Sequence, residues 1–151
     1  MGNIDTHRQA HEAFNSRDWD GVVRDLAPDI QYTDHPHNTT TKNPHEFAEY
    51  KTGWVTGFSD AKVGHARYAE TGDQTIAQFD GTGTNDGPLG SLPATGKTMH
   101  LAFCEVMTYD PDGRIVRGEL YYDQLTVLVQ LGHMASPART NEIADRVRAK
   151  D

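Results

Sequence analysis

Over the first 60 residues, apolar side chains recur at the three-to-four-residue spacing of amphipathic helices. The spacing predicts an N-terminal helix with Ile4, His11 and Phe14 on one face, capped by Asp5 or Thr6. A shorter helix is predicted over residues 18–26 and a short strand over residues 30–34. The first part of the chain is therefore expected to be mainly helical.

A third helix is predicted to begin at the segment Asn43-Pro44-His45-Glu46. The segment combines a capping side chain, a proline at the first helical position and an acid in the first turn, which are typical signals of a helix start. The helix that follows carries four aromatic rings on one face: Phe47, Tyr50, Trp54 and Phe58. This face is expected to pack in the core and, in a hollow domain, to line the pocket as well.

From residue 61 the apolar spacing changes to two, which is typical of strands. Turns rich in glycine, aspartate and proline separate four predicted strands: residues 62–69, 75–84, 97–109 and 114–122. The apolar loop over residues 85–96 is expected to fold over another part of the molecule, and residues 136–151 are expected to form a terminal helix. Helices followed by a meander of antiparallel strands predict an α+β domain, with helices on one face of a curved sheet.

Composition narrows the classes of function. The chain of 151 residues is expected to form one domain with a sizeable core. Its net charge of −8, with no basic face, argues against a nucleic-acid partner. No apolar run approaches the roughly 20 residues of a membrane span, and no apolar signal segment opens the chain, so a cytoplasmic location is expected. The single Cys104 excludes an internal disulfide and fits a reducing compartment.

Two carboxylates are the main candidates for chemistry. Asp123 lies where the last predicted strand gives way to a Leu-rich helical pattern, so it is either the cap of that helix or a proton-transferring group at a strand end. Glu105 lies in the middle of a predicted strand, where a charged side chain is costly to bury unless it is paired or protonated. It either faces a pocket or faces solvent, where it would pair with Arg114 or Arg117.

The eight histidines raise the question of a metal site. His7 and His11 are four residues apart on a predicted helix, and His35 and His37 form a local cluster with Asp34. Zinc requires three or four converging ligands, and the glutamate of a zinc-protease helix is absent from the first pair. No metal is therefore predicted.

Several short segments together indicate a known family. Three of them lie near the N-terminus: Ala13-Phe14-Asn15, Asp18-Trp19-Asp20 and Leu26-Ala27-Pro28-Asp29. The others follow later: Gly81-Thr82-Gly83-Thr84, Gly87-Pro88-Leu89, Pro93-Ala94-Thr95-Gly96-Lys97, Tyr121-Tyr122-Asp123-Gln124-Leu125 and Gln130-Leu131-Gly132. The first group resembles the opening of a nuclear-transport-factor-2-like (NTF2-like) fold, and the second resembles the SnoaL-like polyketide cyclases within that superfamily. The resemblance covers roughly residues 10–132.

The resemblance implies a cone-shaped α+β barrel, with N-terminal helices packed on a curved antiparallel sheet around a pocket for a flat, apolar ligand. The single domain, residues 1–151, would have its core at residues 5–132 and a C-terminal extension at residues 133–151. In the cyclases a carboxylate that matches Asp123 removes a proton from a substrate carbon, and the enolate then closes a ring by aldol attack. No metal or organic cofactor takes part. The family often carries a histidine near position 105, where this chain has Glu105 instead.

The expected function is that of a cofactor-independent cyclase or isomerase acting on a hydrophobic carbonyl compound. Asp123 is expected to be the general base, Glu105 the acid or oxyanion partner, and Tyr121 the donor that polarises the carbonyl. If the two carboxylates share one cavity, the pKa of at least one should be raised. The residues expected to bind the substrate are Trp54, Phe58, Tyr32, His35, Asn85 and Phe103.

Two other functions are compatible with the same fold. One is a non-catalytic module that binds a small molecule in the same cavity. The other is an epoxide-hydrolase-like enzyme, in which two aspartates flank an arginine, although the strand over residues 97–109 contains no arginine. A homodimer through the outer face of the sheet is also expected, as the resemblance suggests and as long exposed strands favour.

Overall fold

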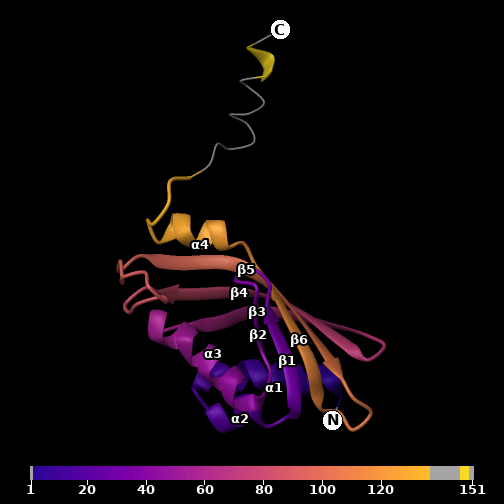
Figure 1. Cartoon of the computed structure of the whole chain (residues 1–151). Helices are drawn as coiled ribbons and strands as arrows, with labels where there is room; N and C mark the ends of the chain where they lie inside the picture. Colours follow the sequence, from indigo (N-terminus) through magenta and orange to yellow (C-terminus); the bar gives the residue numbers. More distant parts are fainter. Residues whose placement is uncertain (1, 137–146, 150–151) are drawn as a thin grey trace.

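The computed structural model describes residues 2–136 and 147–149. The three N-terminal helices lie on one face of a curved sheet, as predicted, whereas the short last helix lies beside the strand over residues 98–109, away from the other three (Figure 1). In chain order the elements are α1 (Asn3–Ser16), α2 (Trp19–Val23), β1 (Leu26–Asp34), β2 (Thr39–Thr41), α3 (Pro44–Gly57), β3 (Lys62–Thr71), β4 (Gln74–Thr84), β5 (Thr98–Tyr109), β6 (Ile115–Tyr121) and α4 (Gln124–Gln130). The predicted terminal helix of residues 136–151 falls largely outside the described residues.

The six strands form one sheet in the order β2-β1-β6-β5-β4-β3. Neighbouring strands are antiparallel except β1 and β6, which run parallel, a pairing that the predicted meander does not contain. The α+β class and the curved sheet are confirmed. Since β2 and β3 remain the two edges, the barrel is an open one.

Helix α3 begins as its sequence predicts. The Asn43 side chain accepts a hydrogen bond from the Glu46 backbone N–H at 2.9 Å, and Pro44 occupies the first helical position. The Glu46 carboxylate in turn accepts from the backbone N–H of Lys42 at 2.7 Å. These bonds satisfy backbone donors that the helix itself leaves unpaired, which sets where α3 starts.

The boundaries of the first two helices differ from the prediction. Helix α1 begins at Asn3 after Gly2, which makes no side-chain cap, so neither Asp5 nor Thr6 is the capping residue. Helix α2 ends at Val23 rather than at residue 26, because Leu26 already pairs with Ile115 at the start of β1. Sheet pairing therefore overrides the helical spacing of the last residues of the predicted segment.

Strand β5 alternates regularly between the two faces of the sheet. Its buried residues are Met99, Leu101, Phe103, Glu105, Met107 and Tyr109. The residues between them, such as Cys104, face away from the helices because side chains along a strand alternate in direction. Glu105 therefore points into the core, although most of its neighbours on that face are apolar.

Two glycines leave room for aromatic rings on the inner face. A Cβ atom on Gly81 would lie 2.3 Å from Cε2 of Phe103, and one on Gly118 would lie 2.3 Å from Cδ2 of Tyr32. Such distances are far inside van der Waals contact, so only glycine fits at these positions. The rings of Phe103 and Tyr32 can thus lie flat across the neighbouring strands.

The loop over residues 85–96 folds over the C-terminal end of α3, which agrees with the expectation that it covers another part of the molecule. The buried Asn85 side chain donates to the carbonyl oxygens of Gly57 at 3.0 Å and Gly87 at 2.9 Å, and accepts from the Thr95 N–H at 2.8 Å. Leu89 lies against Gly57. Asn85 therefore holds the loop to the helix.

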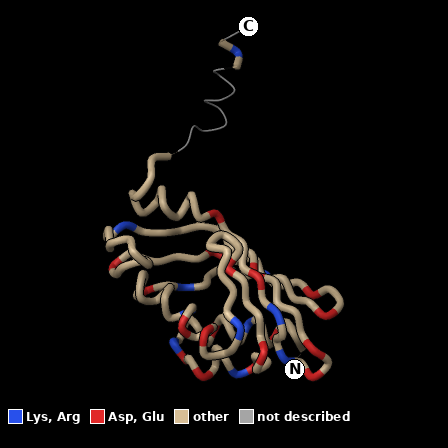
Figure 2. The backbone as a smooth tube through the Cα atoms, in the orientation of Figure 1, with Lys and Arg blue, Asp and Glu red and all other residues tan. Residues whose placement is uncertain are grey.

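The charged residues and the lengths of the helices can be compared with the composition. Figure 2 shows acidic and basic residues intermixed along the described backbone. Within residues 2–136 and 147–149, no helix is long and apolar enough to cross a membrane.

Candidate functional site

A cavity lies between the helices and the inner face of the sheet. Its walls are mainly aromatic and aliphatic, with Phe14, Phe47, Trp54, Phe79, Phe103 and Leu120 among them. Three of its polar lining residues are His11 of α1, Lys51 of α3 and Glu105 of β5. An apolar cavity with a few converging polar groups is the usual form of a small-molecule site.

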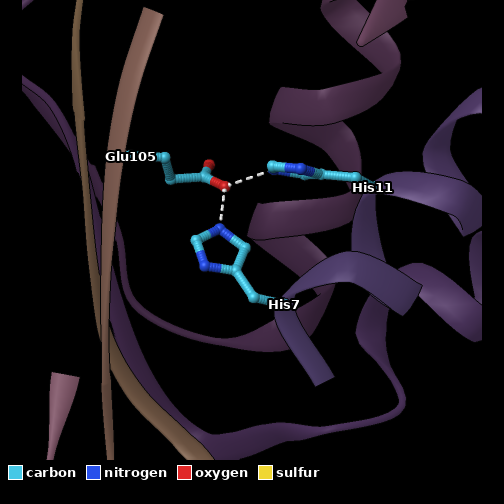
Figure 3. A group of neighbouring side chains, drawn as sticks. All are labelled: His7, His11 and Glu105. Carbon is cyan, nitrogen blue, oxygen red and sulfur yellow. Dashed lines mark hydrogen bonds and ion pairs between the residues drawn. The ribbon is translucent and has the colours of Figure 1, made fainter. Parts of the chain in front are cut away.

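Glu105 is the centre of the polar cluster. Its Oε1 atom lies 2.9 Å from Nε2 of His7 and 2.8 Å from Nε2 of His11 (Figure 3). Its Oε2 atom accepts from the Tyr32 hydroxyl and from Nζ of Lys51, the latter at 3.2 Å. Four donors thus surround the carboxylate, which is 1% exposed, and they offset the cost of burying its charge.

The cluster is assembled from elements that are far apart in the sequence. His7 and His11 lie one helical turn apart on α1, so both rings project from the same face toward β5. Strand alternation directs Glu105 to meet them, and Lys51 reaches it from α3. Side chains from α1, β5 and α3 therefore meet in one site.

The remaining ring nitrogens of the two histidines have hydroxyl partners. Nδ1 of His7 lies 2.8 Å from Oγ1 of Thr75, and Nδ1 of His11 lies 2.8 Å from the Tyr68 hydroxyl. The Thr75 hydroxyl is also 3.0 Å from that of Tyr109. Each ring is therefore held at both nitrogens, which restricts its orientation.

Electrostatics assigns different charges to the carboxylate and to His11. Burial by itself raises the pKa of Glu105, but the Lys51 ammonium and the hydrogen bonds from His11 and His7 outweigh it and hold that pKa well below the usual 4.5. Burial lowers the pKa of His11 below 6.5, helped by the neighbouring His7 and Lys51 and opposed by Glu105. At neutral pH, Glu105 is ionised and His11 is neutral.

Among the described residues, His7, His11 and Glu105 are the group able to supply three ligand atoms to one metal ion, since these atoms lie within 4.8 Å of one another. Two histidines and a carboxylate suit zinc or iron. However, the three donors are bonded to each other, and the Lys51 ammonium lies 3.2 Å from Oε2 of Glu105. That positive charge disfavours a cation here, and the expectation of a metal-free site stays a prediction.

A second buried carboxylate, Asp34, lies close to the cavity wall. Its Oδ2 atom accepts from the hydroxyls of Tyr50 at 2.7 Å and Tyr122 at 2.9 Å and lies 3.1 Å from Nδ1 of His37. Burial and the charge of Asp34 raise the pKa values of both tyrosines. The Tyr122 ring contacts Phe103, so this cluster supports the wall of the cavity.

Asp123 does not lie in the cavity. It is the N-cap of α4, where its side chain accepts from Thr126 N at 3.3 Å and from Thr126 Oγ1 at 2.7 Å. It is exposed and borders a separate groove that Cys104 and Tyr121 also line. The expectation that Asp123 and Glu105 share one cavity is therefore wrong, and a catalytic role for Asp123 stays an untested prediction.

The condition for a raised carboxyl pKa is therefore not met, and neither pKa is raised. Hydrogen bonds from Thr126 lower the pKa of Asp123, and that of Glu105 is also lowered. The two carboxylates do not repel each other, because they do not share a site. As a result Glu105 is ionised and does not have the proton that the predicted acid role requires.

Tyr121 and His35 lie away from the cavity. The Tyr121 ring is 44% exposed and stacks on His35, with ring centroids 4.5 Å apart. Strand alternation directs Tyr121 outward and the next residue, Tyr122, inward. Neither Tyr121 nor His35 therefore lines the cavity.

The other predicted binding residues divide into two groups. Trp54 and Phe103 line the cavity, and Tyr32 lies behind it with its hydroxyl on Glu105. Phe58 and Asn85 are fully buried but do not line the cavity, since they pack at the C-terminal end of α3. The stripe on α3 is thus partly a cavity wall and partly core.

Four residues of the site were not predicted as site residues: His7, His11, Lys51 and Tyr68. The sequence places His11 on the apolar face of the N-terminal helix, and the spacing of His7 and His11 on that face is the mark of a buried polar site. That spacing, together with a glutamate in a buried strand, is the feature of the sequence that indicates this cluster. Nothing local in the sequence distinguishes Lys51 or Tyr68.

The sequence matches the family model described as SnoaL-like polyketide cyclase over residues 4–131. That range covers the whole sheet, α1 to α3 and α4. No curated protein matches the sequence.

Solved structures share the fold at low sequence identity. AclR from Streptomyces galilaeus, a proposed hydroxylase, superposes with a TM-score of 0.81 and 18% identity over 98% of this chain and 92% of its own. IdmH from Streptomyces antibioticus, a proposed polyketide cyclase, has a TM-score of 0.75 and 23% identity over 87% and 99% of the two chains. An NTF2-like protein from Burkholderia pseudomallei has a TM-score of 0.73 and 22% identity, over 87% and 99%. At these identities the likeness shows the fold alone.

Proposed function

Because the chain belongs to the SnoaL-like polyketide cyclase family, we propose that it is an enzyme that transfers a proton within a hydrophobic carbonyl compound bound in the cavity. The observation that carries this proposal is the neutral His11 beside the ionised Glu105 on an otherwise apolar wall. Both groups lack the acidic proton and can accept one, and titratable groups with shifted pKa values on a cavity wall are typical of acid–base sites.

His11 is the proposed general base. Glu105 holds its Nε2, so Nδ1 is the nitrogen that accepts a proton, and the carboxylate stabilises the imidazolium that forms. In this structure Nδ1 accepts a hydrogen bond from Tyr68. Substrate binding must replace that bond, and catalytic hydrogen bonds often reach their final geometry only when the substrate is present.

Lys51 is the proposed partner of the substrate oxygen. An ammonium group has three donors, and two of them bond to Tyr32 and Glu105 at 3.2 Å each. The third is left for a carbonyl oxygen in the cavity, where it would stabilise the enolate that forms when the proton leaves. The aromatic walls, among them Trp54 and Phe103, would hold the flat part of the substrate.

A non-catalytic binding module remains the second candidate, and one observation favours it. All four hydrogen-bonding positions of the Glu105 carboxylate are occupied within the protein, as in a purely structural cluster. The epoxide-hydrolase-like alternative is less well supported, because no arginine lines the cavity among the described residues. The homodimer and the cytoplasmic location stay predictions.

Deuterium exchange tests the proposal without the natural substrate. The α-protons of 2-tetralone, a hydrophobic bicyclic ketone, are followed by NMR in D₂O with the wild type, His11→Gln and His45→Gln. His45 is 84% exposed on α3 and serves as the control. We expect the wild type and the control to accelerate exchange, and His11→Gln to lose roughly 10²–10⁴-fold of that acceleration. Binding of the ketone without accelerated exchange would favour the binding module.

A further inference from the structure

A chain of hydrogen bonds leads from Glu105 through His7 to the backbone of α1. His7 Nδ1 lies 2.8 Å from Thr75 Oγ1, which lies 3.0 Å from the Tyr109 hydroxyl, which lies 3.1 Å from the carbonyl oxygen of Asn3. The side chains of His7, Thr75 and Tyr109 are buried, with His7 and Thr75 fully so. Because each hydroxyl has a single hydrogen, the direction of every bond can be worked out from the two ends.

The Asn3 end sets the direction of the first three bonds. A carbonyl oxygen only accepts, so the Tyr109 hydroxyl donates its hydrogen to Asn3. The bond between Tyr109 and Thr75 must then be donated by Thr75. With the Thr75 hydrogen used in this way, the bond between Thr75 and His7 must be donated by Nδ1 of His7.

The Glu105 end sets the last bond. The carboxylate faces the Lys51 ammonium at 3.2 Å, which keeps it ionised and therefore an acceptor only. Nε2 of His7, at 2.9 Å from Oε1, must then also carry a hydrogen. Both nitrogens of this ring are donors.

We propose that His7 is a buried imidazolium with a proton on each ring nitrogen, whereas His11, bonded to the same oxygen of Glu105, is a neutral imidazole. The two rings differ because their outer partners differ. The Thr75 hydroxyl already donates to Tyr109 and can only accept from His7, while the Tyr68 hydroxyl donates to His11. The groups around His7 are Thr75 of β4, Glu105 and Tyr109 of β5, His11 of α1, and Tyr68 of β3, whose ring centroid lies 5.4 Å away.

This assignment deepens the proposed function. The charge of His7 follows from the hydrogen bonds alone, and only its effect on catalysis rests on the proposed function. His7 and Lys51 then carry two positive charges against the one negative charge of Glu105. The excess positive charge below the cavity would favour an anionic oxygen, such as that of an enolate. It also adds to the effect of burial in keeping His11 neutral, because a second imidazolium on the same carboxylate would repel the first. His7 would act through its neighbours as a positioning residue.

Nitrogen NMR of the full chain tests the assignment directly. In long-range ¹H–¹⁵N spectra of ¹⁵N-histidine-labelled protein, an imidazolium has two nitrogens of nearly equal shift, and a neutral ring has two very different ones. The His7→Gln and His11→Gln variants identify the two rings. At pH 7.5 we expect the imidazolium pattern for His7 and the neutral pattern for His11. A neutral pattern for His7 in the wild type would overturn the proposal.

Two tyrosine variants provide a matched comparison. Tyr109→Phe frees the Thr75 hydrogen to turn toward Nδ1 of His7, so His7 should change to the neutral pattern. Tyr68→Phe removes a donor from His11 alone and should leave the His7 pattern unchanged. An unchanged His7 pattern in a folded Tyr109→Phe protein would contradict the bond directions derived above. None of these readouts depends on turnover, so a failure of the ketone exchange test would be recognised separately.

Discussion

Lys51 and Glu105 form a buried ion pair on the wall of the cavity, with Nζ and Oε2 3.2 Å apart. The Lys51 side chain is 15% exposed, and its ammonium lies over the rings of Tyr32 and Phe47 at 4.9 and 5.2 Å from their centroids. Aromatic faces attract a cation, so the rings help to hold the ammonium in place. The ammonium is therefore held in place on the wall of the cavity.

The first prediction concerns the charge of the ligand. Naphthols of graded acidity should bind the wild type more tightly as they become more acidic, because Lys51 stabilises the anionic oxygen. Lys51→Met should weaken binding of the most acidic naphthol by roughly 10–100-fold, the value of a hydrogen bond to a charged group, and abolish the trend. Calorimetric titration at one pH measures both effects. Lys42→Met is the control, because Lys42 does not line the cavity. If Lys51→Met bound the more acidic naphthols more tightly, as the wild type is expected to, Lys51 would not be the group that stabilises the anionic oxygen.

The second prediction concerns stability and pH. Glu105→Gln leaves the charge of Lys51 without its buried partner and should reduce the free energy of unfolding at pH 7 by about 3–5 kcal/mol. The pKa of Glu105 in the folded protein lies well below its unfolded value of 4.5, so the stabilisation is present above pH 4.5 and is lost as the pH falls below it. The gap between wild type and variant should therefore narrow below pH 4.5.

Urea unfolding of both proteins between pH 3.5 and 7 measures that gap. The pKa of His11 is lowered from 6.5, so below that pH the unfolded wild type binds a proton that the folded protein does not. Its stability should begin to fall below pH 6.5 for that reason. Glu49→Gln, at a side chain that is 68% exposed, should leave the curve nearly unchanged. A gap that is constant with pH would show that folding does not lower the pKa of Glu105.

Much of the fold could be predicted because its signals are local. The cap at Asn43, the alternation along β5 and the turn glycines each depend on a few neighbouring residues, and they predicted the elements correctly. The parallel pairing of β1 with β6 could not be predicted in the same way. It joins Gln31 to Arg117 across most of the chain, and no local pattern records such a contact.

The site was predicted less well, for a related reason. Asp123 has the same sequence context whether it caps α4 or faces a pocket, and the outcome depends on which way the chain turns after β6. Glu105 could be assigned to the inner face from alternation alone. Its partners His7, His11 and Lys51 come from elements 54 to 98 positions away, and only the folded chain brings them together.

The third prediction concerns Tyr68. Its hydroxyl donates to Nδ1 of His11 and so stabilises the neutral imidazole. Tyr68→Phe should raise the pKa of His11 toward 6.5 and leave ketone exchange equal to or faster than in the wild type, because the base is no longer occupied. NMR titration and the exchange assay measure these two effects. A large loss of exchange would instead make Tyr68 part of the proton path.

The fourth prediction separates the two interpretations of Asp123. As the cap of α4 it accepts from Thr126, and Asn is an equally good capping residue. Asp123→Asn should therefore preserve both stability and ketone exchange, while Asp123→Ala should lower stability and leave exchange intact. Thermal unfolding and the exchange assay check the pair. Loss of exchange in a stable Asp123→Asn protein would restore the catalytic role first expected for it.

The last prediction concerns Gly118, which pairs with Tyr32 on β1 and with Met107 on β5. An added Cβ would lie 2.3 Å from Cδ2 of Tyr32 and 2.9 Å from Sδ of Met107, so the Tyr32 ring would have to move. Gly118→Ala should cost about 1–3 kcal/mol, as overpacking does. The displaced ring would also withdraw its hydroxyl from Glu105, so ketone exchange should fall with stability. Gly53→Ala is the control: apart from its own stretch of α3, no atom lies within 4 Å of its added Cβ, and alanine in this helix should stabilise by about 0.5–1 kcal/mol. If both variants were equally stable, Gly118 would not be required for the position of Tyr32.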